Sequence, residues 1–451
     1  MSSHSAPSQA TGHAPGLART LGPFMLWGLG VGYVISGMYF GWNLGLVEGG
    51  PYGLALALVL VTVLYATFVL SYAELSCAIP HAGGAFNYAL RAFGGGKLGR
   101  GLAALTGTAQ VIEFVFAPPA IAAAIGAYAV LFVPSWSPTW VGLAAYALFT
   151  ALNIWGVRQS AIFELVVTVA AVVELLIFAG VTLPHFSWHA FSQNPLPHGW
   201  GGAFAAIPYA IWFYLAIEGV ANVAEEARNP QRDLSRGFGS AMATLVVLAF
   251  LTFFAAVGVA GWEAVVYPTG AQGGATSDSP LPLALARVVG ENHGLYHLLL
   301  TIGIFGLVAS FHGIILVAGR AVLEMGRQGF APRFLGRVHP KRQTPVAALL
   351  VNWAIGAVAL LSGKTGEIIT VSVFGALALY ILSMISLFRL RQVEPGLERP
   401  YHAPGYPWVP GLALVLSVFC WVAMAAAQPW LAAIFVGIWL TLSVGSAALR
   451  G

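Results

Sequence analysis

Long apolar runs separated by short polar segments dominate the pattern along the chain. A helix needs about 20 apolar residues to cross a bilayer, and twelve runs reach or approach this length. They cover residues 24–46, 52–77, 100–127, 140–156, 160–183, 203–224, 238–261, 296–318, 345–362, 368–388, 409–427 and 429–448. The pattern predicts an all-α integral membrane protein with twelve transmembrane helices.

Three segments between or before these runs carry expectations of their own. Residues 1–20 are rich in Ser, Ala, Pro and Gly with one basic residue, which predicts a disordered tail rather than a signal peptide. Residues 82–93 (AGGAFNYALRAF) are amphipathic and predict a short helix at the cytoplasmic interface. The polar insert 262–294 predicts an extracellular loop. No run of residues is left for a soluble domain.

Composition excludes the soluble classes of protein. Only 8% of the residues are charged and 58% are hydrophobic, and the mean hydropathy is +0.81. An average globular chain has about 25% charged residues. The net charge of +4 is spread over 451 residues without a basic patch interleaved with aromatics, so we expect no nucleic-acid partner. Cys77 and Cys420 lie in or beside apolar runs and do not predict a disulfide framework.

The basic residues give the orientation in the membrane. Lys and Arg accumulate in cytoplasmic loops. If the amino terminus is inside, all of the 20 Lys and Arg residues except Arg287 and Lys364 fall on the cytoplasmic side. This distribution predicts a multi-pass protein of the cell membrane with both termini in the cytoplasm.

Residues 28–41 of the first apolar run contain five glycines, which weaken a helix by about 1 kcal/mol each relative to alanine. They are Gly28, Gly30, Gly32, Gly37 and Gly41. One interpretation is close helix packing through small residues. The other is an unwound break in the helix, and its residues would be Ile35, Ser36, Gly37 and Met38.

The sixth run places Glu218 and Gly219 well inside an apolar stretch. A carboxylate at the bilayer centre costs about 2.5 kcal/mol or more, so such residues normally face a cavity. Interruptions in corresponding helices of two halves are typical of inverted-repeat transporters with a midplane site. We therefore expect a transport core at 21–390, with repeats at about 21–190 and 200–390. Residues 391–451 would add two further helices.

Four carboxylates lie within the predicted spans, and no Lys or Arg lies deep in any of them. They are Glu113, Glu164, Glu174 and Glu218. This excess of acidic over basic side chains favours a cation or a proton in the interior. For Glu164 we expect either snorkelling or a pair with Arg158. Glu174 fits both a neutral acid in helix packing and a proton relay.

Glu113 follows Arg100 by 13 residues, or about 20 Å along a helix, which places it near the midplane. Pro118 and Pro119 follow and disturb the regular helix. Two hypotheses stay open: Glu113 binds the ammonium group of a substrate, or it is protonated and bonds a neighbouring helix.

Two histidine pairs have helical spacing, His185 with His189 and His293 with His297. Zinc would require further ligands that this spacing does not supply. We predict no metal site and no cofactor.

Four motifs resemble those of a known group of transporters. The segments SYAELSCAIPHAGGAFNYALRAFG (71–94) and EGVANVAEEARNPQRDL (218–234) resemble the amino-acid/polyamine/organocation permease superfamily. Within it, VGYVISGMYFGWNLGL (31–46) and VIEFVFAPPAIAAAIGAY (111–128) are similar to ethanolamine permeases. Met38 departs from the pattern of the superfamily, which usually has a small residue there.

The resemblance implies the leucine-transporter fold, a 5+5 inverted repeat with substrate between the broken first and sixth helices. It implies that the break at Ile35, Ser36, Gly37 and Met38 binds the polar or carboxylate end of the substrate. Carbonyls near Ala216 and Ile217 would bind the amine, Trp212 or Tyr214 would gate it, and Glu218 would couple transport to protons.

These observations predict a secondary active transporter, not an enzyme. Its substrate would be an ethanolamine-like amine or a small neutral amino acid, and the coupling ion a proton or else sodium. An exchanger of the same superfamily is the alternative. An integral-membrane enzyme is disfavoured because no catalytic cluster stands near one membrane face, and a channel because no filter element repeats.

Overall fold

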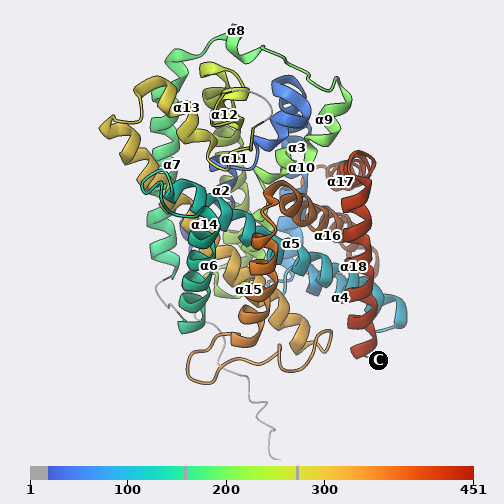
Figure 1. Cartoon of the computed structure of the whole chain (residues 1–451). Coiled ribbons are helices and arrows are strands. Elements are labelled where there is room, and N and C mark those ends of the chain that lie inside the picture. Colours follow the sequence, from blue (N-terminus) through green and yellow to red (C-terminus); the bar gives the residue numbers. More distant parts are fainter. Residues whose placement is uncertain (1–18, 157–159, 271–273, 451) are drawn as a thin grey trace, which may run out of the picture.

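The computed structural model describes residues 19–156, 160–270 and 274–450, and over these residues it is helical (Figure 1). Apart from the helices it contains one isolated β-bridge, between Leu21 and Ala227. The first helices are α1 (Pro23–Val34), α2 (Ser36–Tyr39), α3 (Leu44–Ala78), α4 (Ala85–Phe93), α5 (Lys97–Ala129), α6 (Pro138–Trp155), α7 (Ser160–Thr182), η1 (Leu183–His185), α8 (Trp188–Phe191), α9 (Gly201–Ala205) and α10 (Ile207–Trp212). They are followed by η2 (Ile217–Glu226), α11 (Pro230–Ala260), α12 (Glu263–Val266), α13 (Pro280–Val289), α14 (Gly294–Arg327), α15 (Val346–Leu361), α16 (Thr365–Val393), α17 (Trp408–Ala427) and α18 (Pro429–Leu449).

Helices form within each of the twelve predicted apolar runs, and the first and sixth of these runs are interrupted. Nine helical segments in this part of the chain are long and apolar enough to cross a membrane. The other three runs are the interrupted one at 24–46 and those at 140–156 and 345–362, which form α6 and α15. The chain is therefore a multi-pass membrane protein.

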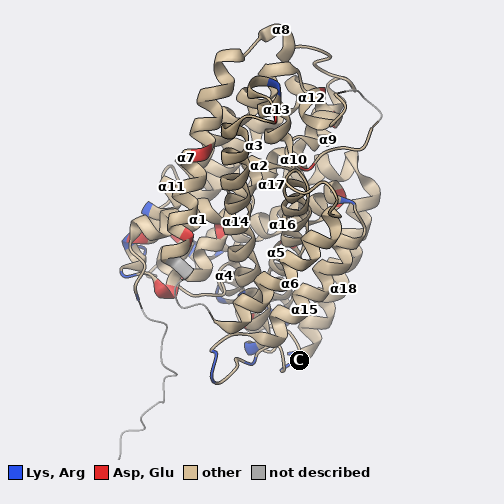
Figure 2. Cartoon of the chain, turned by 60° about the vertical axis from the view of Figure 1, so that its left-hand side comes forward, with Lys and Arg blue, Asp and Glu red and all other residues tan. Residues whose placement is uncertain are grey.

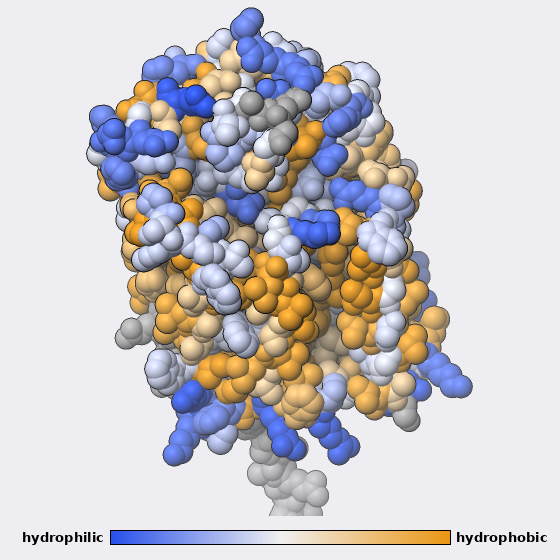
Figure 3. Space-filling view, in the orientation of Figure 1, coloured by the Kyte–Doolittle hydropathy of each residue, from blue (hydrophilic) through white to orange (hydrophobic). Residues whose placement is uncertain are grey.

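The surface agrees with this assignment. On the face that Figure 3 shows, apolar side chains occupy most of the middle of the bundle, and hydrophilic ones gather at its two ends. Val358 on α15, Val415 on α17 and Val444 on α18 are strongly exposed. Lys and Arg gather mainly at the end that holds the C-terminus, which we call the lower end (Figure 2). The upper end carries α8, α12 and α13 (Figure 1).

The helices differ sharply in how deeply they lie in the bundle. The most apolar stretch of the segment 207–226 is 100% buried, that of α16 is 89% buried and that of α18 only 17%. Helix α5 packs against α16 and α14, and α1 packs against α11, α7 and α14. The first and sixth runs are thus enclosed by protein, while α17 and α18 lie at the periphery.

Two of the expectations for polar segments have a definite outcome. A helix does form within residues 82–93, as α4, and its side chains are mostly buried against α5 and α16. The expectation of a loop at 262–294 is wrong in part, because α12 and α13 form there. Helix α13 has the apolar sequence PLPLALARVV with Pro280 in its first turn, where proline is well tolerated.

A buried ion pair joins the end of α3 to the end of α16. The Glu74 side chain is only 1% exposed and accepts a hydrogen bond from Arg391 Nε at 2.9 Å. Arg399 Nε lies 3.3 Å from the same carboxylate, and the Ala403 backbone N–H donates to it at 2.7 Å. One carboxylate therefore pairs with two guanidinium groups and anchors the chain that leads to α17.

We predict that Glu74→Gln lowers stability by about 3–5 kcal/mol, because removing one partner of a buried ion pair leaves the other charges uncompensated. Thermal unfolding of the purified protein in detergent measures the loss. The matched control is Glu367→Gln, which breaks the exposed pair with Lys364 and should cost less than about 1 kcal/mol. Equal unfolding temperatures for the two variants would contradict the assignment.

Candidate functional site

The first transmembrane run is interrupted near its middle. Helix α1 ends at Val34, and residues 36–39 close a single further turn as α2. Phe40 is then fully extended, and Gly41 has a φ of +86° before α3 begins. The sequence predicted the break at residues 35–38, whereas the widest departure from helix comes at residues 40–43. The reason is that the left-handed conformation suits Gly41.

The sixth run is interrupted in the same manner. Helix α10 ends at Trp212, the next four residues are turns, and the chain continues as the 3-10 helix η2. Ala216 immediately precedes η2 and has a φ of +78°. A residue with a Cβ is strained in this left-handed conformation, so the surrounding contacts hold the break in place.

The two breaks touch each other through their backbones. A Cβ atom added to Gly37 would lie 2.3 Å from the carbonyl oxygen of Trp212. The rings of Phe40 and Trp212 meet edge to face with centroids 5.5 Å apart. Only a glycine permits this approach of the first run to the sixth.

A narrow cavity lies beside the breaks, and its space, counted together with the solvent to which it opens, is about 180 Å³. We call it the central cavity. Its lining residues come from the two interrupted runs and from α5 and α14, and they are Tyr33, Val34, Ser36, Ala117, Trp212, Leu215 and Ile314. The walls are mostly apolar, with the Ser36 hydroxyl as a polar group. That hydroxyl donates to Ser310 Oγ at 2.9 Å, and Ser310 in turn donates to the Tyr33 carbonyl.

All the site residues predicted from the sequence are buried, but they do not form one group. Ser36 and Trp212 line the central cavity. Tyr214 is directed toward α3, where its hydroxyl contacts Thr62 Oγ1 at 2.8 Å and its ring packs on Tyr65. The remaining neutral ones surround the breaks without lining the cavity, and they are Ile35, Gly37, Met38, Ala216 and Ile217.

Sequence reasoning missed five lining residues: Tyr33, Val34, Ala117, Leu215 and Ile314. Tyr33 and Val34 immediately precede the predicted break, and Leu215 lies inside the second one. Ala117 directly precedes the proline pair of α5, which was a usable signal. Nothing in the apolar run of α14 distinguishes Ile314.

The structure brings Glu113 and Glu218 together. Their carboxyl groups lie close enough to interact, although they come from α5 and η2. We call them the carboxyl pair. The Tyr380 hydroxyl donates to Glu218 Oε2 at 2.8 Å, and the Tyr65 hydroxyl lies 3.0 Å from that of Tyr380. Because Tyr380 has a single proton to donate, Tyr65 must donate to Tyr380. Two adjacent carboxyl groups cannot both be ionised at low cost, so the pair is suited to hold one proton.

The other two carboxylates within the spans lie apart from this pair. Glu164 is 1% exposed, so it does not snorkel, and its expected partner Arg158 lies outside the described residues. A Cβ added to Gly32 would lie 2.9 Å from Glu164 Oε1, so the glycine makes room for the carboxylate. Glu174 accepts a hydrogen bond from the Tyr39 hydroxyl at 2.6 Å.

Contacts close the lower end beneath the central cavity. Arg320 Nη2 of α14 lies 2.7 Å from Glu226 Oε1 at the end of η2. The Leu21 N–H donates to the Glu226 carbonyl, and the Arg228 N–H donates to the Leu21 carbonyl. The start of the first run and the end of the sixth are thereby joined.

Polar contacts also hold the upper end. The Asn43 amide donates to the Ser277 carbonyl at 2.8 Å, and the Thr365 hydroxyl donates to Asp278 Oδ2 at 2.9 Å. Burial raises the pKa of Asp278 to about 6, against the opposing effect of the Thr365 hydrogen bond. The segment before α13 is thus tied to α3 and α16 at the same time.

A small cavity between two interrupted helices, inside a multi-pass helical bundle, is typical of a membrane transporter. The chain belongs to the amino acid permease family, whose model matches residues 21–445. It is a member of the amino-acid/polyamine/organocation superfamily, as the motifs indicated, and its family and relatives are transporters rather than enzymes.

Relatives that are named as transporters match most of the chain, and two of them are named for different substrates. The uncharacterized transporter R00093 of Rhizobium meliloti is 29% identical over 420 residues, covering 91% of this chain and 87% of the relative. The branched-chain amino acid permease BcaP of Bacillus subtilis is 26% identical, covering 94% and 92%. The low-affinity putrescine importer PlaP of Escherichia coli is 26% identical, covering 77% and 76%.

We predict opposite stability effects for glycine at two neighbouring alanines of the sixth run. Ala216→Gly should be neutral or stabilise the protein by up to about 1 kcal/mol, because it removes left-handed strain. Ala210→Gly, in the regular helix α10, should destabilise it by about 1 kcal/mol. Thermal unfolding without substrate measures both. A loss in Ala216→Gly as large as that in Ala210→Gly would show that the strained conformation is absent.

Proposed function

We propose that this permease is a proton-coupled secondary active importer of a small neutral amino acid or a small ethanolamine-like amine. The observation that carries the proposal is the central cavity between the two breaks, with the carboxyl pair on the same helices. In this proposal the chain spans the cell membrane twelve times, with both termini in the cytoplasm. The fold is that of the leucine transporter, with inverted repeats at about 21–190 and 200–390.

The lining of the central cavity supports a substrate with one apolar part. Val34, Ala117, Leu215 and Ile314 supply apolar walls, and a buried side chain of matching character gains about 25 cal/mol per Å² of apolar surface. A second ammonium group, as in a diamine, would face these walls without a partner at a high cost. The cavity therefore suits a neutral amino acid or a monoamine better than a diamine.

The polar groups of the substrate would be held by the breaks themselves. Backbone groups at Ile35, Ser36, Gly37 and Met38 would bind the carboxylate or hydroxyl end, aided by the positive ends of the short helices. Carbonyls near Ala216 and Ile217 would accept from the ammonium group. Trp212 lies at the cavity and would close over the substrate, while Tyr214 would support the break from the side of α3.

The carboxyl pair would supply the negative charge that binds a proton and that compensates a substrate ammonium group. Glu218 is linked to Tyr380 on α16, so its protonation changes a hydrogen bond between η2 and a neighbouring helix. Glu113 stands on α5 four residues before Ala117, which lines the cavity. In our proposal Glu218 carries the transported proton, and Glu113 compensates the substrate ammonium group.

We predict that Glu218→Gln abolishes proton-driven accumulation of substrate while exchange across the membrane continues. Glutamine keeps the shape and can still bond Tyr380, but it cannot gain and lose a proton. Radiolabelled leucine and ethanolamine uptake into proteoliposomes under an imposed pH gradient measures accumulation, and counterflow without a gradient measures exchange.

The same assay tests Glu113 and the choice of mechanism. Glu113→Gln should weaken substrate binding by about 1–3 kcal/mol, as expected for a lost charge-assisted hydrogen bond, with folding intact. Undiminished accumulation in Glu218→Gln would remove this residue from coupling. Counterflow without any accumulation by the unaltered protein would favour an exchanger.

The proposed orientation predicts which cysteines react from outside the cell. Arg337→Cys lies at an exposed position of the loop at the lower end and should be labelled by a membrane-impermeant thiol reagent only after the cells are opened. Thr276→Cys, exposed at the upper end, should react in intact cells. The native Cys77 and Cys420 are buried and should give no background. The reverse pattern of labelling would invert the topology.

A further inference from the structure

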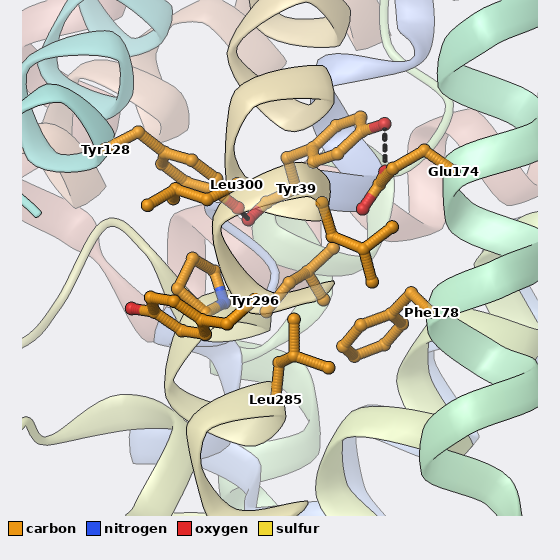
Figure 4. A pocket seen from close by; sticks show the side chains of 10 residues that line it. Tyr39, Tyr128, Glu174, Phe178, Leu285, Tyr296 and Leu300 are labelled. Carbon is orange, nitrogen blue, oxygen red and sulfur yellow. Dashed lines mark hydrogen bonds between the residues drawn. The ribbon is translucent and has the colours of Figure 1, made fainter. Parts of the chain in front are cut away.

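A second pocket lies between α2, α5, α7, α13 and α14, on the upper-end side of the bundle (Figure 4). Its space, counted together with the solvent to which it opens, is about 240 Å³, and it shares no lining residue with the central cavity. We call it the aromatic pocket. Its lining residues are Tyr39, Tyr128, Glu174, Phe178, Leu281, Pro282, Leu285, Tyr296, Leu299 and Leu300.

Glu174 supplies the acidic group in the lining of the aromatic pocket. Its Oε2 atom accepts from the Tyr39 hydroxyl at 2.6 Å, and its other oxygen is turned toward the pocket (Figure 4). The side chain is only 3% exposed. None of the ten lining residues is Lys, Arg or His, so the lining offers no basic partner for this carboxyl group.

Four aromatic rings line the same space: those of Tyr39, Tyr128, Phe178 and Tyr296. The Tyr128 hydroxyl donates to the Tyr39 carbonyl at 3.0 Å, and the two rings meet edge to face. The hydroxyl protons of Tyr39 and Tyr128 are therefore committed to protein acceptors. What these residues offer a ligand is the electron-rich surface of their rings.

We propose that the aromatic pocket is a second binding site, for a small organic ammonium ion with an alkyl body. A cation within about 6 Å of aromatic ring centroids is attracted to their faces, and the Glu174 carboxylate adds a charge-assisted contact. The leucines and Pro282 bury the alkyl part. A bound anion would be repelled by the carboxylate. A bound neutral alkane would leave the carboxylate without a cationic partner.

The site goes beyond the proposed transport activity and bears on it through α2. Tyr39 ends this short helix, and Ser36 at its other end lines the central cavity. A Cβ added to Gly306 would lie 2.8 Å from the Tyr39 ring, so the ring is fixed against α14. An occupant of the aromatic pocket would therefore stabilise the present position of α2.

The test uses n-butylammonium chloride as the probe, with 1-butanol and sodium chloride as controls for its alkyl part and its salt. Isothermal titration of the purified full-length protein should show binding of the ammonium salt alone. Glu174→Gln retains a hydrogen-bond acceptor for Tyr39 but loses the charge, and it should weaken binding about tenfold or more. Leu285→Trp should reduce binding by filling the pocket.

The matched control is Ala117→Leu, which reduces the central cavity and leaves the aromatic pocket unchanged. Butylammonium binding should persist in this variant even though binding of the transported substrate is lost. Loss of butylammonium binding in Ala117→Leu, with none in Glu174→Gln, would assign the ion to the central cavity and overturn the proposal. Equal binding of 1-butanol, or no binding by the unaltered protein, would overturn it as well. If the Leu285→Trp variant does not fold, butylammonium binding by the Glu174→Gln variant decides whether the proposal holds. Substrate uptake by the unaltered protein tests the transport proposal separately.

Discussion

The absence of water from the bilayer core is the constraint on which the rest of this structure depends. A backbone N–H or C=O left without a partner there costs several kcal/mol, so an interrupted helix is tolerated only inside protein. In the part of the chain that the structure describes, the first and sixth runs are interrupted at residues 40–43 and 213–216, and both interruptions are enclosed. Helices α5, α14 and α16 surround them, and α17 and α18 lie outside. The arrangement of inner and outer helices thus follows from the need to keep two short non-helical stretches of backbone away from lipid.

The position of a carboxylate relative to the bundle ends decides what it can do. Glu74, near the lower end, meets Arg391 and Arg399 and serves as a structural anchor. Among the described residues, Glu113 and Glu218 lie buried within the bundle, and Glu218 accepts a hydrogen bond from the Tyr380 hydroxyl. A fixed positive partner would hold such a group permanently ionised. Hydroxyl partners allow it to exchange a proton, which a coupled transporter requires.

The sequence predicted the helical runs well, because apolar length and periodicity depend on the bilayer alone. It also located both interruptions to within a few residues, through the glycines of the first run and through Glu218. It could not predict that Tyr214 is directed toward Thr62 while Leu215 lines the cavity, since that depends on the φ of +78° at Ala216. The sequence predicts a loop at 262–294 because the Gly, Pro and Ser content of this segment outweighs the short apolar stretch of α13. Pairing between distant residues, such as Glu174 with Tyr39, leaves no trace in local sequence.

The bridge between Leu21 and Ala227 has a mechanical consequence. It joins the start of α1 to the end of η2 by backbone hydrogen bonds, and Arg320 holds the same junction from α14. The lower halves of the two interrupted runs are therefore linked, and they would move as one rigid unit about the breaks. A movement of this unit away from α14 would break the ion pair between Arg320 and Glu226. Salt screens such a partly exposed pair, so a higher ionic strength would weaken the attachment of the unit to α14.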